Sequence, residues 1–134
     1  MRLLIDTNII VEIIAKRKGY EESIQVLRWC EVNIIDGFVT ATTITDLMYI
    51  LRKHIAPENV REAVQKLLLA LDIAGVLKSD INAALLSGMN DFEDAVQSSC
   101  AGRINADYIV TRNVKDFANS PVPAILPGEA LALI

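Results

Sequence analysis

The first eight residues hold the feature that most constrains the fold of this chain. Residues 3–5 form a continuous apolar run, Leu-Leu-Ile, that leads directly into Asp6, Thr7 and Asn8. A run of this kind is typical of a strand that is buried on both faces, as in a parallel sheet. Ligands of such sheets bind at the C-terminal ends of the strands. Asp6 therefore lies where the predicted fold would place its chemistry.

The rest of the chain alternates between strand and helix patterns. Further strands are expected over residues 38–40, 73–77, 108–111 and 122–126, the last at a sheet edge because it contains Pro123. Helices are expected over residues 7–16, 21–32, 42–55, 57–71, 80–87 and 91–105, and from residue 127 onward. Alternation of this kind predicts an α/β protein with a small, mostly parallel sheet of about five strands. We expect one domain over residues 1–134.

Composition excludes several classes of protein. The only histidine is His54, so a multi-histidine zinc site is impossible. Cys30 and Cys100 lack metal-site spacing and are expected to be free thiols of a cytoplasmic protein. No apolar stretch is long enough for a membrane span, and the chain enters its first strand without a secretory signal. The net charge of −4 does not exclude a polyanionic partner, because clustered carboxylates can be neutralised by cations.

Several polar side chains stand at the ends of the expected elements. They are Asp6, Asp46, Asp91, Asp94, Asn113 and Asp116. A first-turn carboxylate can simply stabilise its helix, and the pairs Thr43/Asp46 and Asp91/Asp94 have capping-box spacing. Asp6 has no such explanation, because a lone acid after a buried strand is costly unless it is paired or coordinated. Carboxylates gathered at one sheet edge would repel one another unless Mg²⁺ or Mn²⁺ joined them.

The same stretches resemble the four motifs of the PIN domain family, which are metal-dependent nucleases that include the VapC-type toxins. The first motif is similar to residues 4–8, the second to 42–51, the third to 91–95 and the fourth to 108–117. The resemblance spans essentially the whole chain. It implies a three-layer α/β/α sandwich and an acidic pocket that holds one or two Mg²⁺ or Mn²⁺ ions.

The resemblance also implies roles for particular residues. Asp6, Asp46, Asp94 and Asp116 would be catalytic metal ligands, with Asn113 as a polar pocket neighbour. Asp46 is one methylene shorter than the glutamate that is more common in the second motif, and a bridging water would make up its reach to the metal. Asp91 is expected to cap its helix rather than to coordinate. Arg103, Arg112 and Lys115 are the candidate contacts to RNA, and Lys16, Arg17, Arg52 and Lys53 are more distant ones.

Three functions are compatible with these residues. The first is a metal-dependent endoribonuclease, as the toxin of a toxin–antitoxin pair, with a small antitoxin partner, a homodimeric state and a cytoplasmic location implied by the resemblance. The second is a non-catalytic binding module of the same fold. The third is a haloacid-dehalogenase-type phosphatase with Asp6 as nucleophile, although Asn8 stands where that family needs a second acid.

Overall fold

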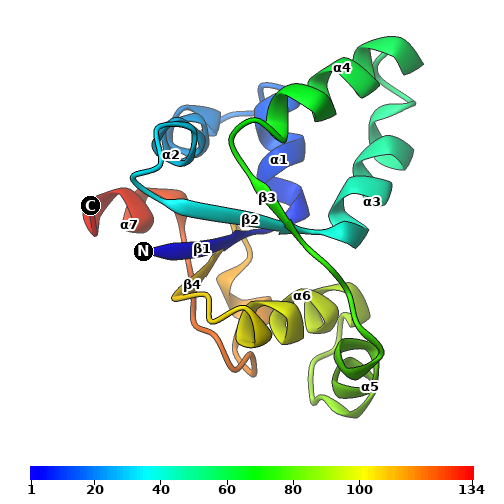
Figure 1. Ribbon diagram of the computed structural model, residues 1–134, viewed down its shortest axis with the longest axis vertical. Helices are drawn as coiled ribbons and strands as arrows, with labels where there is room; N and C mark the ends of the chain where they lie inside the picture. The colour runs from blue at the N-terminus through cyan, green and yellow to red at the C-terminus, as the bar shows by residue number, and fades with distance from the viewer.

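The computed structural model describes all 134 residues as seven α-helices, one 3-10 helix and five strands (Figure 1). The strands are β1 (Arg2–Ile5), β2 (Asp36–Thr40), β3 (Asp72–Ala74), β4 (Tyr108–Val110) and β5 (Ala124–Ile125). The helices are α1 (Thr7–Ile14), α2 (Tyr20–Glu31), α3 (Ala41–Leu51), α4 (Pro57–Leu67), α5 (Lys78–Leu86), α6 (Phe92–Arg103) and α7 (Pro127–Ala132), and the 3-10 helix is η1 (Val114–Phe117).

The five strands form one sheet with the order β3-β2-β1-β4-β5, and every neighbouring pair is parallel. The first strand lies in the middle, where Leu4 pairs with Phe38 on one side and with Ile109 on the other. The predicted α/β class with a small parallel sheet of five strands is confirmed, and β5 lies at an edge as predicted. Asp6, directly after β1, is therefore at the centre of the C-terminal edge of the sheet.

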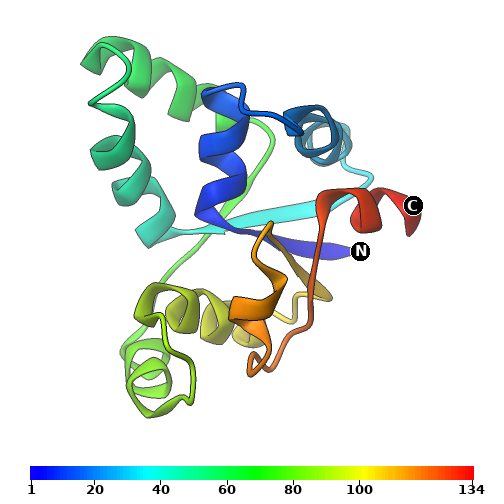
Figure 2. The same ribbon diagram turned by 180° about the vertical axis from the view of Figure 1, so that it is seen from behind.

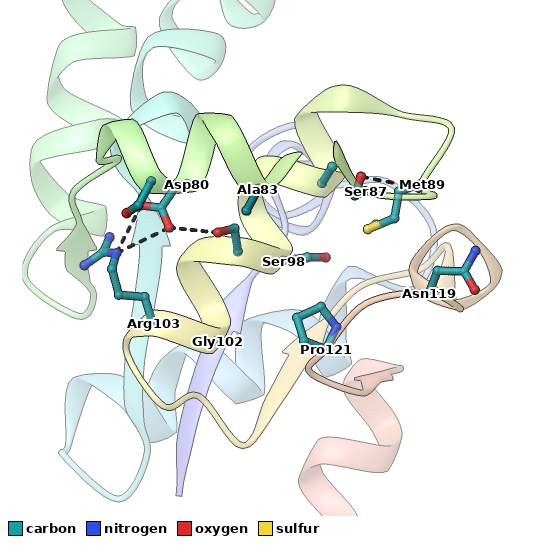
Figure 3. A pocket seen from close by; sticks show the side chains of 12 residues that line it. Asp80, Ala83, Ser87, Met89, Ser98, Gly102, Arg103, Asn119 and Pro121 are labelled. Carbon is teal, nitrogen blue, oxygen red and sulfur yellow. Dashed lines mark hydrogen bonds and ion pairs between the residues drawn. The ribbon is translucent and has the colours of Figure 1, made fainter. Parts of the chain in front are cut away.

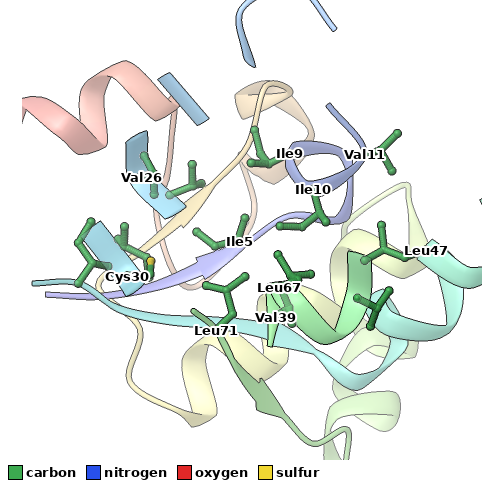
Figure 4. Packing of buried hydrophobic residues seen from close by; sticks show 14 of the residues in the cluster. Ile5, Ile9, Ile10, Val11, Val26, Cys30, Val39, Leu47, Leu67 and Leu71 are labelled. Atoms are coloured by element: carbon green, nitrogen blue, oxygen red, sulfur yellow. The ribbon is translucent and has the colours of Figure 1, made fainter. Parts of the chain in front are cut away.

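Helices cover both faces of the sheet, which gives the three layers of an α/β/α sandwich. Figures 1 and 2 show α1, α2, α3 and α4 on one face, with α7 against α2, and α6 on the other face with α5 packed outside it. The larger apolar core lies on the first face and contains Leu3 and Ile5 of β1 (Figure 4). A smaller core cluster lies on the second face and contains Leu4 and Ile109. Successive side chains of β1 point to opposite faces of the sheet, so this strand contributes to both cores.

The start of α3 differs from the prediction. The helix begins at Ala41, and its N-cap is Thr40, whose side chain accepts a hydrogen bond from the backbone N–H of Thr43. The predicted capping box of Thr43 and Asp46 is therefore wrong, because Asp46 lies in the second turn, where an acid has no free N–H groups to cap. This change matters for function, since it removes the structural explanation for Asp46.

Other boundaries differ by a few residues. Helix α1 ends at Ile14, and the left-handed residue after it is Lys16 (φ 51°), whereas Gly19 (φ 89°) stands before α2. Helix α5 begins at Lys78, and Asp80 accepts a hydrogen bond from the backbone N–H of Leu77 instead of being the cap residue itself. Strand β3 and helix α4 are shorter than predicted. None of these shifts moves an element to the other face of the sheet.

Both cysteines, Cys30 and Cys100, are buried free thiols, as predicted. None of the helices combines the length and the apolar character that crossing a membrane requires.

Candidate active site

Asp6 is held from two directions at the centre of the sheet edge. Its side chain is buried, with 2% of the residue exposed. Carboxylate Oδ1 accepts a hydrogen bond of 3.0 Å from Nε2 of Gln97 on α6, and Oδ2 accepts one of 2.9 Å from Oγ1 of Thr111 after β4. The two donors come from segments that are far from Asp6 in the sequence. The fold thus fixes the orientation of this carboxylate.

No basic side chain compensates the charge of Asp6. The four ion pairs of the protein involve other acids, namely Glu12, Asp36, Glu62 and Asp80. Burial raises the pKa of Asp6 above its ordinary value, while the hydrogen bonds from Gln97 and Thr111 act in the opposite direction. A buried carboxylate that is oriented but not neutralised is suited to binding a cation or a proton.

Asp46 and Glu93 form a second acidic group beside Asp6. The pKa of Glu93 is raised to about 8, first by a hydrogen bond with the carboxyl group of Asp46, then by burial and by the charges of Asp46, Asp91 and Asp6. The neighbouring acids thus favour the protonated form of Glu93. Oγ1 of Thr7 lies 3.5 Å from Oε1 of Glu93, which places Glu93 beside the start of α1, where the chain has just passed Asp6. The structure therefore joins Asp46 to the site through Glu93.

Glu93 is a site residue that is not among those expected from the sequence. Its position next to Asp94 in the first turn of α6 was the available signal, because two acids in one turn can both face a neighbouring element. The sequence does not show how α3 packs, and it is this packing that brings Asp46 close to Glu93.

Asp94 is influenced by the charges of three other acids. Burial raises its pKa to about 7, and the charges of Asp91, Asp6 and Asp116 add to this effect. Asp91 is the N-cap of α6, and its Oδ1 accepts a hydrogen bond of 2.9 Å from the backbone N–H of Asp94, in agreement with the predicted cap. Asp116 is exposed on η1 yet close enough to influence Asp94. Acids from the end of β1, from α3, from the start of α6 and from η1 thus influence one another electrostatically.

Asn113 belongs to this edge through its backbone. It is the exposed residue before η1, and its N–H donates a hydrogen bond of 3.0 Å to Oγ1 of Thr111, the hydroxyl that also binds Asp6. Its side chain makes no hydrogen bond within the protein.

Comparison with known proteins assigns the sequence to a family. The sequence model of the PIN domain matches residues 2–115. The chain belongs to the PIN domain family. A search of the curated proteins gave no significant match.

Solved structures with the same fold agree with this assignment. A VapBC2 structure from Rickettsia felis, bound to a DNA fragment of its promoter, matches with a TM-score of 0.75 at 20% identity and covers 94% of this chain and 98% of that one. VapBC-1 from nontypeable Haemophilus influenzae matches with a TM-score of 0.72 at 16% identity over 96% and 99%. A toxin–antitoxin complex from Klebsiella pneumoniae matches with a TM-score of 0.69 at 20% identity over 93% and 97%. At identities this low, the TM-scores and coverages show a shared fold and nothing more. Membership of the PIN family also argues against the phosphatase alternative.

The basic residues of this PIN domain occupy different environments. Arg112 donates from Nε to Oε1 of the buried Glu12 over 2.8 Å and from Nη2 to the carbonyl of Gly19 over 2.6 Å. Arg103 donates from Nε to Oδ2 of Asp80 over 3.0 Å. Both arginines therefore hold structural elements together. Lys115 is exposed and takes part in none of the ion pairs. The same holds for Lys16, Arg17, Arg52 and Lys53.

Lys115 borders a polar hollow of about 370 Å³ next to the acids. The hollow is lined by Gly88, Met89, Asn90, Asp91, Lys115, Asp116, Ala118 and Asn119. It lies between the start of α6 and the end of η1, so a phosphate at Lys115 would be close to Asp116 and Asp91. Of the three predicted RNA contacts, Lys115 is the one that the structure leaves free to bind a ligand.

The acids fit a hard divalent cation in donor type and charge. All of them offer carboxylate oxygen, the donor that Mg²⁺ and Mn²⁺ prefer, and no lysine or arginine neutralises them. Neighbouring acids and burial raise the pKa values of Asp94 and Glu93, and a bound cation would favour their charged forms. No three of them lie close enough in this structure to hold an ion together. Coordination would thus require the side chains to move toward one another.

Proposed function

We propose that this PIN domain is a Mg²⁺- or Mn²⁺-dependent endoribonuclease that hydrolyses RNA phosphodiester bonds. The observation that carries the proposal is the uncompensated set of acids around Asp6, which is buried and oriented by Gln97 and Thr111 without a basic partner. The residues that would hold one or two ions are Asp6, Asp46, Asp94 and Asp116, with Glu93 added to the set inferred from the sequence.

The protein's own residues would contribute binding, orientation and proton control. A bound divalent ion would polarise the phosphate and activate water. Gln97 and Thr111 keep the Asp6 carboxylate in one orientation, so less ordering is needed when an ion arrives. Because the pKa of Glu93 is raised, its carboxyl group must lose a proton before it can bind a cation, since metal ligands are deprotonated. Lys115 would attract the RNA backbone to the hollow beside Asp116.

The decisive experiment is RNA cleavage by Asp6→Asn and Asp94→Asn variants. Both keep the size of the side chain and remove a charge, so we expect folded proteins without metal-dependent cleavage. Asp72→Asn is the matched control, because Asp72 is exposed on β3 and outside the site. Cleavage by both site variants at the wild-type rate would refute the proposal and favour the non-catalytic binding module.

We also propose that the enzyme is a cytoplasmic toxin that forms a homodimer and is restrained by a small antitoxin. Support comes from the similar structures, which are described as toxin–antitoxin or VapBC complexes. Expression of the chain should arrest growth, and co-expression of the small protein encoded by the adjacent gene should relieve the arrest. Sequencing of RNA ends after induction, with Asp6→Asn as control, would identify the target. Growth that is unaffected by the wild-type protein would contradict the toxin assignment without bearing on cleavage in vitro.

A further inference from the structure

A second pocket lies on the α5 side of α6, next to the acids but separate from them. It has a volume of about 460 Å³, within the range of small-ligand sites. We call it the α5–α6 pocket; it is lined by Ser79, Asp80, Ala83, Ser87, Met89, Ala95, Ser98, Ser99, Gly102, Arg103, Asn119 and Pro121 (Figure 3). The residues from α6 recur at intervals of three and four, so one face of this helix forms the floor of the pocket.

The pocket contains a buried hydroxyl group that has no partner. Ser98 is 1% exposed, and its Oγ makes no hydrogen bond. In Figure 3 this oxygen points from α6 toward the side on which Met89, Asn119 and Pro121 lie. A buried hydroxyl without a partner costs stability, so it requires an explanation. A ligand that exchanges a hydrogen bond with Ser98 would supply one.

The charges of the pocket cancel each other. Asp80 and Arg103 are its only charged residues, and they form an ion pair of 3.0 Å. Asp80 also accepts hydrogen bonds of 2.9 Å from Oγ of Ser99 and from the backbone N–H of Leu77. Its carboxylate is thus fully used within the protein. A phosphate or an ammonium group would find no free opposite charge here, so the occupant is expected to be neutral.

The remaining lining combines small apolar surfaces with an amide. Ala83, Ala95, Met89 and Pro121 offer apolar walls, and the exposed Asn119 offers both donors and an acceptor. A nucleobase has this character, because its faces are apolar and its edge carries donors and acceptors. RNA-binding proteins read unstacked bases in this way.

The α5–α6 pocket adjoins the polar hollow beside the acids. Met89 and Asn119 line both this pocket and the polar hollow that contains Lys115 and Asp116. Asp94 and Ser98 are four residues apart on α6, about one helical turn or roughly 6 Å along the axis. We propose that the α5–α6 pocket binds one base of the RNA next to the phosphate that is cleaved, and so contributes sequence preference. This inference rests on the proposed ribonuclease function.

Binding can be measured without cleavage. We would record amide NMR spectra of the isotope-labelled protein in EDTA during titration with each of the four ribonucleoside 5′-monophosphates. At least one should cause saturable shifts at Ser98, Met89 and the side-chain amide of Asn119. Ala83→Trp fills the pocket from an exposed position on α5 and should weaken this binding about tenfold or more, the range of one base-stacking contact. Asn82→Trp, on the same helix but outside the pocket, should not.

Ser98→Ala separates a binding role from a structural role. It removes a hydroxyl that has no partner, so the stability of the protein should stay equal or rise while nucleotide binding weakens. A loss of stability with unchanged binding would overturn the inference.

Cleavage of an RNA pool with randomised sequence gives an independent readout. The wild-type enzyme and Asn82→Trp should prefer a particular base beside the cut, and Ala83→Trp should lose that preference. Metal-dependent cleavage without any shift in the pocket would overturn the base site and leave the nuclease intact. Pocket shifts without cleavage would overturn the nuclease and leave a nucleotide site. Shifts confined to Lys115 and Asp116, or produced only by the protein encoded next to this chain, would also refute the inference.

Discussion

Asp94→Asn should make the metal-free protein more stable at high pH while it removes activity. The pKa of Asp94 is raised from 3.8 to about 7 by burial and by neighbouring acids. At about 1.4 kcal/mol per pKa unit, that difference corresponds to a ceiling of about 4 kcal/mol. Because the site is open to water, screening reduces this ceiling, and we expect roughly 1–2 kcal/mol. Asparagine avoids this cost because it has no charge.

The pH dependence gives the sign of the effect. The folded protein binds the Asp94 proton more tightly than the unfolded chain does, so this group stabilises the fold fully below its unfolded pKa. That contribution is lost as the pH rises from about 4 through about 7. The variant lacks this loss. The stability gap between variant and wild type should therefore widen by roughly 1–2 kcal/mol between pH 5 and pH 8.

Urea unfolding followed by the fluorescence of Trp29, the only tryptophan, measures the gap. The titrations are run in EDTA at both pH values, with Asp72→Asn as the control for net charge. Added Mn²⁺ should then stabilise the wild type more than the variant, because a ligand that binds the folded state stabilises it. A gap that stays constant with pH, or a variant that is less stable at pH 8, would refute the electrostatic account of the site.

Two further predictions test the other assignments. Arg112→Met should destabilise the protein by about 2–4 kcal/mol in urea unfolding, because it leaves the buried carboxylate of Glu12 without its ion pair. Lys115→Ala should leave stability unchanged and weaken RNA binding at low salt. The opposite pattern would reverse the two roles. Gly37→Ala should lower the free energy of unfolding by about 1–3 kcal/mol, because the added Cβ would lie 2.5 Å from Sγ of Cys30. At Gly75 an added Cβ meets nothing within 4 Å, so Gly75→Ala should leave the melting temperature nearly unchanged. Equal melting temperatures for both variants would contradict the packing around Gly37.

The sequence was sufficient for the fold class because its strongest signals are local. An apolar run of strand length followed by an acid identified β1, and the alternation of elements predicted the parallel sheet. The cap at Asp91 was also predictable, since it depends only on the residue three positions later. The cap of α3 was not, because Thr40 and Thr43 are equally good cap residues, and the choice between them depends on where β2 ends.

The partners of charged side chains were beyond local reasoning. Arg112 pairs with Glu12, one hundred residues earlier in the chain, and Arg103 with Asp80 on a neighbouring helix. Glu93 was overlooked for the same reason, because only the packed positions of α3 and α6 bring it to Asp46. The assignment of Asp6, Asp46, Asp94 and Asp116 as metal ligands stays a prediction.

The central place of β1 in the sheet has a consequence for synthesis of the protein on the ribosome. The strand made first has β2 on one side, but its other neighbour, β4, is made about one hundred residues later. The two groups that orient Asp6, Gln97 and Thr111, also come from this late part of the chain. During synthesis the Asp6 carboxylate is therefore present long before Gln97 and Thr111 are available to orient it. If the proposed ribonuclease activity depends on this oriented carboxylate, the activity cannot arise until almost the whole chain has been synthesised.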